Sequence, residues 1–325
     1  MKQLFNSSSV ILLLTGLFYF VSSCNNGPAE VSIPSSEIIS VRQSGAVFKG
    51  IIKAKGKNSV TSRGVCWSPG TEPSIKDKIV SGGKGTGDYF CTIDGLKPAA
   101  TYYARAYALS TTDTIYGNII TFTTQDYGSV TDSEGNEYKT ITIGTQTWMV
   151  KNLAATKYND GTSIPLVADS SKWASLSSHG YCFYNNDPEA YKASFGVLYN
   201  GYTVNSGKIC PSGWHVPSNE EWDVLAAYLG GNNVAGGRMK EAGTSHWVRP
   251  NSGASNTGNF SALPGGLRYH DGHFHDLGFG GYWWSSTQYS ATRGYFIFLF
   301  HEDSTFYRFD NLKTNGFSIR CLKNN

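Results

Sequence analysis

The residues best suited to chemistry lie in the segment YHDGHFHD, residues 269–276, which holds three histidines and two aspartates. Imidazole and carboxylate groups ligate zinc, so His270, His273 and His275 are the nearest approach to a metal site. In a strand or turn these histidines need not point the same way, and no second ligand cluster lies nearby in the sequence. We favour surface histidines in a loop and expect no metal and no cofactor, with a metal-dependent enzyme as the alternative.

Familiar catalytic motifs do not occur elsewhere. The sequence contains no GxSxG and no HExxH, and paired acids such as Glu220 and Glu221 are adjacent, as on a solvated helix face. The YNND of residues 184–187 and the YND of residues 158–160 offer oxygen atoms to calcium, but we favour turns held by Asn and Asp. We therefore expect no catalytic residues and no enzymatic activity.

Aromatic residues are concentrated near the C-terminus. Between Leu267 and Phe309 they fill 14 of 43 positions, about a third, against 14% for the whole chain. A segment this aromatic, broken by Gly, Ser, His and Asp, cannot all be core, and Tyr, Phe and His supply rigid contact area to recognition surfaces. We assign Trp283, Trp284 and about half of YFIFLF to core strands and predict a ligand-binding face from the rest. The residues of this predicted face are Tyr269, His270, Asp271, His273, His275, Asp276, Phe279, Phe298, Phe300, His301, Asp303, Phe306, Tyr307 and Phe309.

The composition restricts the elements that can carry this face. The chain has 325 residues, enough for about two domains, and its wealth of Gly and aromatic residues favours short strands and turns over helices. With 27 Lys and Arg against 24 Asp and Glu, the formal net charge of +3 gives no general case for nucleic-acid binding.

The first 24 residues indicate the compartment. Lys2 precedes an apolar run, Val10 to Val21, that is too short to span a bilayer comfortably and has the layout of a secretory signal. The closing VSSC resembles the bacterial lipobox, which implies that residues 1–23 are removed and Cys24 is acylated; an uncleaved anchor is the alternative. Residues 24–36 follow as a polar tether. Because the cysteine is followed by Asn rather than Asp, we expect an outer-membrane protein whose lipid anchor contacts the membrane, at the cell surface or the periplasmic face.

Residues 37–125 have the pattern of an all-β sandwich, because strand-like runs recur between turn signals such as SGGKGTG. We predict strands at residues 38–41, 46–52, 60–67, 88–93, 101–109 and 114–123. GLKPAATYYARAYA, residues 95–108, resembles the corner and F strand of fibronectin type III domains, with Tyr102 as the corner tyrosine. The resemblance implies a spacer domain. Cys66 and Cys91 fall on strands of opposite sheets, where a disulfide and two buried thiols are both open.

Residues 126–325 form the second unit. Ser218 and Glu221 make a capping-box pattern for a helix that Gly230 ends, and GFSIRCLK, residues 316–323, alternates like a final buried strand. DSEGNEY, TWMVKNL, YCFYNND, CPSGWHVPSNEEW, GGRMKEAG, LPGG, YWWSST and GFSIRC, in this order, resemble the Fibrobacter succinogenes major paralogous domain family of bacterial surface proteins. The resemblance implies an α+β domain of the C-type lectin-like fold, with few helices and long ordered loops.

Within that domain we favour a disulfide between Cys210 and Cys321. It would close a loop of roughly 110 residues, worth on the order of 4 kcal/mol, and would tie the last strand to the segment before the helix. Cys182 is then a buried thiol, and a Cys182 to Cys210 bond is the alternative.

The lectin-like resemblance also bears on the ligand. The EPN or QPD and WND tripeptides of calcium-dependent sugar binding do not occur, and a formylglycine-generating oxidase would need a second cysteine near Cys321. Lectin-like domains include the variable proteins of diversity-generating retroelements, whose variable positions take the residue types found on the predicted face. We hypothesise a diversified face on a lipid-anchored adhesion protein that binds a glycan or a protein. A structural subunit of a surface layer or fimbria is the alternative.

Overall fold

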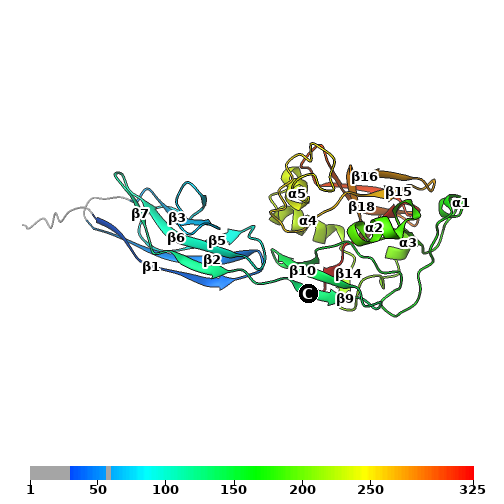
Figure 1. Cartoon of the computed structure of the whole chain (residues 1–325), viewed down its shortest axis with the longest axis horizontal. Coiled ribbons are helices and arrows are strands. Elements are labelled where there is room, and N and C mark those ends of the chain that lie inside the picture. Colours follow the sequence, from blue (N-terminus) through cyan, green and yellow to red (C-terminus); the bar gives the residue numbers. More distant parts are fainter. Residues whose placement is uncertain (1–29, 56–59) are drawn as a thin grey trace, which may run out of the picture.

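The computed structural model describes residues 30–55 and 60–325. Two domains lie end to end along the long axis (Figure 1): a β-sandwich that starts at Glu30, and a larger C-terminal domain that starts at β9 (Gly128–Thr131). The predicted signal peptide and Cys24 lie outside the described residues. Within the described ranges, no helix is both long and apolar enough to cross a membrane.

Two sheets build the sandwich. One has the strand order β1-β2-β5, and the other has the order β4-β3-β6-β7, with β8 also paired to β6. The strands are β1 (Glu30–Val41), β2 (Gly45–Lys55), β3 (Ser62–Ser68), β4 (Lys78–Ser81), β5 (Gly87–Asp94), β6 (Thr101–Leu109), β7 (Thr114–Tyr116) and β8 (Ile120–Thr123). Alternate residues of both sheets point inward, so Phe48, Ile93 and Ala104 are completely buried in a shared core.

The first strand begins earlier than the sequence predicts. β1 pairs with β2 from Glu30 onward, so residues 30–36 belong to the sandwich and the predicted tether is wrong over that part. A register shift contains Pro34, which lacks the N–H that a continuous ladder needs, while Val31 and Ile33 pack against the core. Because this segment is polar, its composition did not indicate that it forms an irregular edge strand.

Tyr102 forms the predicted tyrosine corner, because its hydroxyl accepts a hydrogen bond from the Lys97 N–H at 3.0 Å. The two cysteines of the sandwich lie on β3 and β5, in opposite sheets as predicted, and both Cys66 and Cys91 are buried free thiols. Burial raises the pKa of both thiols, that of Cys91 to about 11, which keeps them protonated at neutral pH.

Two sheets also organise the C-terminal domain. The smaller has the order β14-β21-β11-β10-β9, and the larger has the order β12-β13-β20-β15-β17-β18-β19, with β16 paired to β15. The smaller sheet contains β9, β10 (Glu137–Ile143), β11 (Gln146–Met149), β14 (Trp214–His215) and β21 (Leu322–Lys323). The larger contains β12 (Tyr181–Cys182), β13 (Leu198–Asn200), β15 (Gly265–Arg268), β16 (Phe274–Leu277), β17 (Gly280–Gln288), β18 (Arg293–Phe300), β19 (Tyr307–Leu312) and β20 (Gly316–Phe317).

Short helices fill the space around these sheets. They are α1 (Ser170–Ala174), the 3-10 helix η1 (Tyr184–Asn186), α2 (Pro188–Phe195), α3 (Gly201–Val204), α4 (Asn219–Tyr228) and α5 (Asn232–Met239). α4 is the predicted helix: Ser218 and Glu221 make both capping-box hydrogen bonds, and Gly230 follows its end with a φ of 96°. In Figure 1, α4 and α5 lie at the end that faces the sandwich, and α1 lies at the far end.

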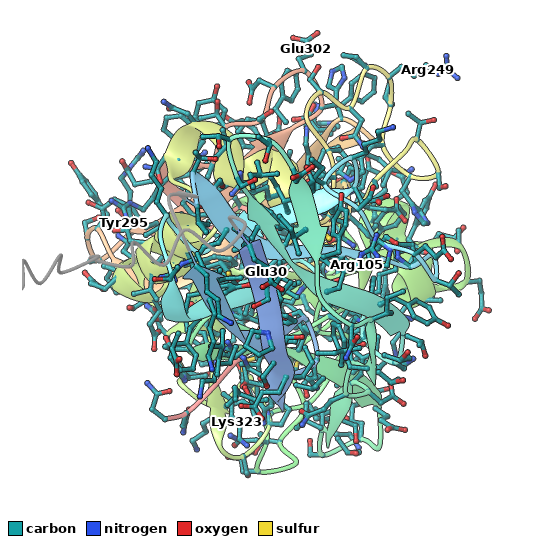
Figure 2. The ribbon with its side chains drawn as sticks, turned by 90° about the vertical axis from the view of Figure 1, so that its left-hand side faces the viewer. Glu30, Arg105, Arg249, Tyr295, Glu302 and Lys323 are labelled. Carbon is teal, nitrogen blue, oxygen red and sulfur yellow. A yellow bond between two sulfur atoms is a disulfide. The ribbon has the colours of Figure 1, made fainter. Side chains whose placement is uncertain are left out.

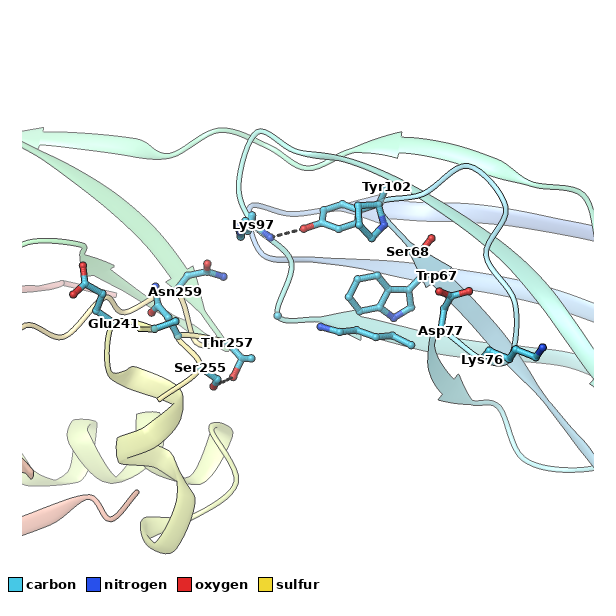
Figure 3. A pocket seen from close by; sticks show the side chains of 15 residues that line it. Trp67, Ser68, Lys76, Asp77, Lys97, Tyr102, Glu241, Ser255, Thr257 and Asn259 are labelled. Atoms are coloured by element: carbon cyan, nitrogen blue, oxygen red, sulfur yellow. Dashed lines mark hydrogen bonds between the residues drawn. The ribbon is translucent and has the colours of Figure 1, made fainter. Parts of the chain in front are cut away.

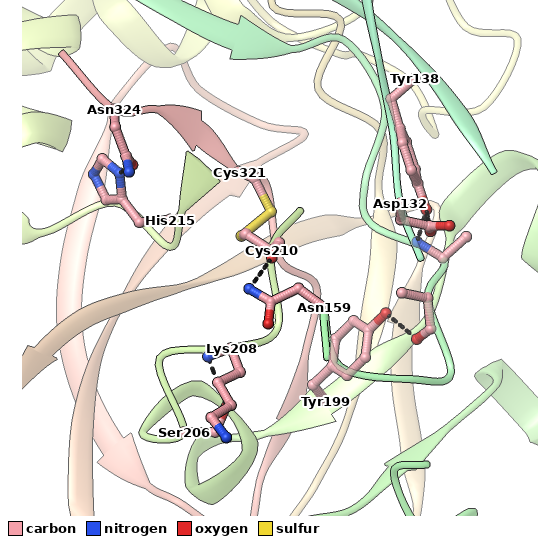
Figure 4. The surroundings of a disulfide bond; sticks show 12 residues. Asp132, Tyr138, Asn159, Tyr199, Ser206, Lys208, Cys210, His215, Cys321 and Asn324 are labelled. Atoms are coloured by element: carbon pink, nitrogen blue, oxygen red, sulfur yellow. Dashed lines mark hydrogen bonds between the residues drawn. A yellow bond between two sulfur atoms is a disulfide. The ribbon is translucent and has the colours of Figure 1, made fainter. Parts of the chain in front are cut away.

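The closing segment, residues 316–323, joins the two sheets. The sequence predicts one strand here, but the chain forms β20 in the larger sheet and β21 in the smaller one. Between them Cys321 is bonded to Cys210, with 5.9 Å between their Cα atoms, which confirms the favoured pairing (Figure 4). Cys182 is a buried free thiol, and burial raises its pKa to about 12, so it is unreactive at neutral pH.

Four cations, Lys240, Arg268, Lys313 and Arg320, are buried in the C-terminal domain without a carboxylate partner among the described residues. The Lys313 ammonium donates to the Ala291 carbonyl oxygen at 3.0 Å. The Lys240 ammonium donates to three main-chain carbonyl oxygens at 2.7 to 3.0 Å. The Arg268 guanidinium, on the β15–β16 hairpin, donates to the main-chain carbonyl oxygens of residues 167 and 168. The Arg320 guanidinium, in the closing segment, donates to the carbonyl oxygens of Met149 and Phe260. Each therefore cross-links loops that would otherwise leave carbonyl groups unsatisfied.

The domains meet through polar contacts. Gln43, in the turn between β1 and β2, accepts a hydrogen bond from the Thr142 N–H at 2.8 Å and donates to the Asp126 carbonyl at 2.9 Å. Asn259 donates to the Leu96 carbonyl at 2.8 Å. These bonds hold the end of the sandwich against β10 and against the loop that precedes β15.

Candidate binding face

The predicted face takes shape on one side of β17, β18 and β19. These strands are antiparallel neighbours, with Tyr282 opposite Phe298 and Phe298 opposite Tyr307. Because side chains alternate along a strand, Ile297 and Leu299 enter the core while Phe298 and its alternate neighbours point to the other side. As predicted, about half of YFIFLF is core: Phe296, Ile297 and Leu299 are buried, whereas Phe298 and Phe300 are partly exposed.

Aromatic rings cross four strands in a series that we call the aromatic row: Phe317, Tyr282, Phe298 and Tyr307. Successive ring centroids lie 5.4, 4.7 and 5.9 Å apart, with interplanar angles of 20°, 27° and 30°. Tyr282 of β17 is therefore stacked against both Phe317 of β20 and Phe298 of β18. Phe309, which is 51% exposed, stacks on Tyr307 and extends the row.

A pocket of about 380 Å³ opens beside the aromatic row, a volume within the range of small-ligand sites. The residues that line it are Leu267, Tyr269, His275, Asp276, Tyr282, Phe296, Asn311 and Phe317. Its floor is apolar, because Leu267, Phe296 and Phe317 are buried core residues. Its rim is polar and comes from the β15–β16 hairpin and from β19.

The rim carries polar atoms that the described part of the chain leaves free. Oδ2 of Asp276 accepts a hydrogen bond from the Tyr282 hydroxyl at 2.5 Å, while its other carboxylate oxygen has no donor there. Oδ1 of Asn311 accepts from the Leu312 N–H at 2.9 Å, and its amide nitrogen has no acceptor within the same residues. Burial, and then the hydrogen bond to Asp276, raises the pKa of Tyr282, so its hydroxyl remains a donor.

Four predicted residues at or beside the tip of the β15–β16 hairpin are His270, Asp271, His273 and His275, and only the last of them lines the pocket. His273 and Asp271 are exposed at the tip, with 3.3 Å between Nδ1 and Oδ1, and His270 lies half-buried against Tyr269 with an unpartnered Nδ1. His275 lines the pocket instead. In the part of the chain that the structure describes, no three His, Cys, Asp or Glu side chains are grouped as metal ligands would be.

The loops considered for calcium use their carboxylates internally. Asp187 caps α2 by accepting a hydrogen bond from the Ala190 N–H at 3.0 Å. Asp160 pairs with Lys208 at 2.9 Å, and hydrogen bonds from Thr162 and Lys208 lower the pKa of its carboxyl group. The expected turns held by Asn and Asp account for both loops.

Two residues of the predicted face are interior, which corrects the prediction for them. Phe306 is 3% exposed and packs against Trp222, because alternation turns it away from Tyr307 and into the core. His301 is 6% exposed, and its Nδ1 lies 3.1 Å from the Arg249 carbonyl oxygen. Neither side chain can present a large surface to a ligand.

The remaining residues of the predicted face gather at one margin of the domain, which Glu302 marks in Figure 2. Phe279 is 44% exposed and packs edge-on against His301, with 5.3 Å between ring centroids. Phe300 is half-buried against the same imidazole, and Asp303 accepts a hydrogen bond from the tyrosine that begins β19. This margin continues the aromatic surface beyond the pocket.

A larger cavity of about 840 Å³ lies at the junction between the domains (Figure 3). Across it, Trp67 and Tyr102 of the sandwich face Glu241 and Asn259 of the C-terminal domain. Several of its polar groups are engaged: the Tyr102 hydroxyl and Asn259 bond main-chain groups, and Glu241 pairs with His246 at 2.9 Å. We place the candidate site at the smaller pocket, because it lies beside the aromatic row and is lined by Tyr269, His275 and Asp276 of the predicted face.

Five pocket residues lie outside the predicted face: Leu267, Tyr282, Phe296, Asn311 and Phe317. Tyr282 precedes the buried Trp283 on β17. Because side chains alternate along a strand, this neighbour is a sequence signal that would have placed Tyr282 on the face. Asn311 and Phe317 reach the pocket only through the pairing of distant strands. No local pattern in the sequence indicates that pairing.

The fold and the site define a two-domain, mostly β chain in which a sandwich precedes a domain with an aromatic-floored pocket. The sequence model of the Fibrobacter succinogenes major domain matches residues 141–323, more than half of the chain, so the protein belongs to that family. The family expected from the eight motifs is thereby confirmed. No curated protein matches the chain.

Solved structures of other proteins resemble part of this chain. They include the sensor domain of the anti-sigma factor RsgI4 of Pseudobacteroides cellulosolvens, at 18% identity over 31% of this chain and 97% of that chain, with a TM-score of 0.23. The fn3 domain of the human collagen alpha-1(XX) chain is 19% identical over 34% of this chain and 98% of that chain, with a TM-score of 0.25. The fn3 domain of human contactin 1 is 11% identical over 38% and 94%, with a TM-score of 0.23. At these scores the likeness carries no argument about function.

Proposed function

We propose that the protein is a lipid-anchored binding protein of the cell envelope, which recognises a ligand without turnover through the aromatic row and its pocket. The observation that carries this proposal is the convergence of free polar atoms of Asp276 and Asn311 above an aromatic floor. Exposed aromatic side chains such as Phe309 add contact area at little entropic cost.

The proposal assigns the C-terminal domain to the C-type lectin-like fold and the sandwich to the fibronectin type III class, as a spacer. Few short helices, two small sheets and a disulfide at the closing segment support the first assignment. The sheet order and the Tyr102 corner support the second. The spacer would hold the pocket away from the membrane.

We further propose that the exposed part of the predicted face is diversified. Its exposed positions include Asp271, His273, Phe279 and Phe309, which lie on turns and an edge strand where substitutions cost little stability. Sequencing of paralogues from the same genome tests this proposal. Differences concentrated at these positions support it, and differences spread evenly over the domain contradict it.

The membrane anchor is assigned to Cys24 and the location to the outer membrane, on the lipobox pattern of the sequence. Metabolic labelling with a radioactive fatty acid, followed by membrane fractionation, tests both. The wild-type chain should be labelled and should sediment with outer membranes, whereas a Cys24→Ala chain should be unlabelled. Equal labelling of the two chains would contradict the anchor.

The binding proposal is tested by screening the purified mature chain against glycan and surface-protein arrays. The aromatic variant carries Phe279→Ala, Tyr307→Ala and Phe309→Ala, and the control carries Phe90→Ala, which removes a ring that is 62% exposed on the sandwich. We expect hits that the control retains and the aromatic variant loses, with melting temperatures close to that of the wild-type chain. Hits that all three proteins retain would refute the proposal.

Self-assembly into a surface structure is the second candidate function. β19 is one of the two end strands in the order of the larger sheet, and outer strands can template pairing with another chain. Sedimentation velocity of the mature chain at rising concentration tests it. A single monomeric boundary at all concentrations would exclude this candidate, and growing oligomers would support it.

A further inference from the structure

We infer that the pocket binds one sugar ring of a neutral glycan, an inference that rests on the proposed function and names its ligand class. A pyranose presents apolar C–H groups on its ring faces and hydroxyl groups around its edge. The buried floor of Leu267, Phe296 and Phe317 suits the apolar face, and the polar rim stands where hydroxyl groups would lie. The volume of about 380 Å³ lies at the lower end of the range for ligand sites, as a single ring requires.

The two free rim groups are chemically complementary to hydroxyl groups. The free carboxylate oxygen of Asp276 accepts a hydrogen bond, and the free amide nitrogen of Asn311 donates one. A hydroxyl group can do both, so a polyhydroxylated ring satisfies the two groups together. A wholly apolar ligand would leave both buried without partners, at a cost that opposes its binding.

The charges around the pocket argue against an acidic glycan. Asp276 is the one carboxylate among the eight lining residues, and neither lysine nor arginine is among them. Lysine does not occur in residues 241–312, and Arg293 and Arg308 are each paired with an aspartate. A carboxylate or sulfate on the ligand would meet no free cation here and would be repelled by Asp276.

The test measures the affinity of the mature full chain for biotinylated neutral oligosaccharides and for their sialylated or uronic-acid counterparts, by biolayer interferometry. Asp276→Asn replaces the free acceptor oxygen of the rim with a donor, and Asn311→Asp replaces the free donor nitrogen with an acceptor. Both variants keep the oxygen atom that accepts the internal hydrogen bond. Asn also accepts the positive φ of 62° at position 276. Asp88→Asn makes the same charge change on the sandwich, outside the predicted face, and is the control.

We expect both rim variants to weaken binding of a neutral oligosaccharide at least about tenfold, and the control to stay within about twofold of the wild-type chain. The acidic counterparts should bind the wild-type chain at least about tenfold more weakly than the neutral ones. Absence of neutral-glycan binding, preference for an acidic glycan, or equal weakening by Asp88→Asn would overturn the inference.

The failure of this inference can be told apart from the failure of the proposed function. If a protein or a basic ligand binds, and its binding depends on Phe309 but not on Asp276, the aromatic recognition surface is supported and a sugar is rejected as its ligand. Binding that survives in the triple aromatic variant would reject the recognition surface itself.

Discussion

Breaking the Cys210–Cys321 disulfide should be one of the most damaging small changes to the C-terminal domain. The bond joins residues that are 111 positions apart, and the chain-entropy relation for such a loop gives about 5 kcal/mol of stabilisation at 25 °C. Small domains are stable by only about 5 to 15 kcal/mol in total. The bond also fixes the residue before β21, the strand that lies between β14 and β11, so its loss frees the edge of the smaller sheet.

The assay is urea unfolding of a Cys210→Ala, Cys321→Ala chain followed by tryptophan fluorescence. All tryptophans except Trp67 lie in the C-terminal domain, so the signal reports that domain. We expect its unfolding free energy to fall by about 3 to 5 kcal/mol, whereas Cys182→Ala, which removes a buried thiol that forms no bond, should cost only about 1 kcal/mol. A double variant within about 1 kcal/mol of the wild-type chain would refute the reasoning.

Three further predictions concern the framework of the site. Burial lowers the pKa of Lys240 from 10.5 to about 8, so between these pH values the folded chain binds fewer protons than the unfolded chain and this lysine adds stability as pH rises. We therefore expect the difference between the unfolding free energies of the wild-type and Lys240→Met chains to increase from pH 8 to pH 10, by up to about 1.4 kcal/mol per pH unit. A constant difference would contradict this. Gln43→Ala removes hydrogen bonds across the domain junction and should increase the radius of gyration in small-angle X-ray scattering; an identical scattering curve would show that Gln43 does not hold the domains. Ser218→Ala removes the cap of α4 and should lower the unfolding free energy by about 1 kcal/mol in urea, against no change for Ser177→Ala, which removes an exposed hydroxyl group.

Short-range signals made much of the fold predictable. Ser218, Glu221 and Gly230 specify both ends of α4 through bonds to near neighbours, so the sequence alone located that helix. The Tyr102 corner is similarly local, since its partner lies five residues upstream. Alternation likewise predicted the division of YFIFLF, because a strand directs successive side chains to opposite faces whatever it pairs with.

Long-range pairing accounts for what the sequence did not reveal. Composition alone could not show that Phe306 turns inward against Trp222, because the side that a strand presents depends on its neighbours in the sheet. Asn311 reaches the pocket because β19 pairs with β18, and Phe317 reaches it because β20 pairs with β13 and β15. The pocket is therefore a product of sheet order, although several of its residues were predicted from their types.

The central claim is that the surface around the aromatic row is where the ligand binds. The most direct measurement is photo-crosslinking with a benzophenone amino acid placed at position 309 or at position 90, using the ligand identified on the arrays. Phe90 is 62% exposed and Phe309 is 51% exposed, so exposure alone would favour crosslinks from the sandwich. The account predicts an adduct from position 309 and none from position 90. Equal adducts from both positions, or an adduct from position 90 alone, would contradict it.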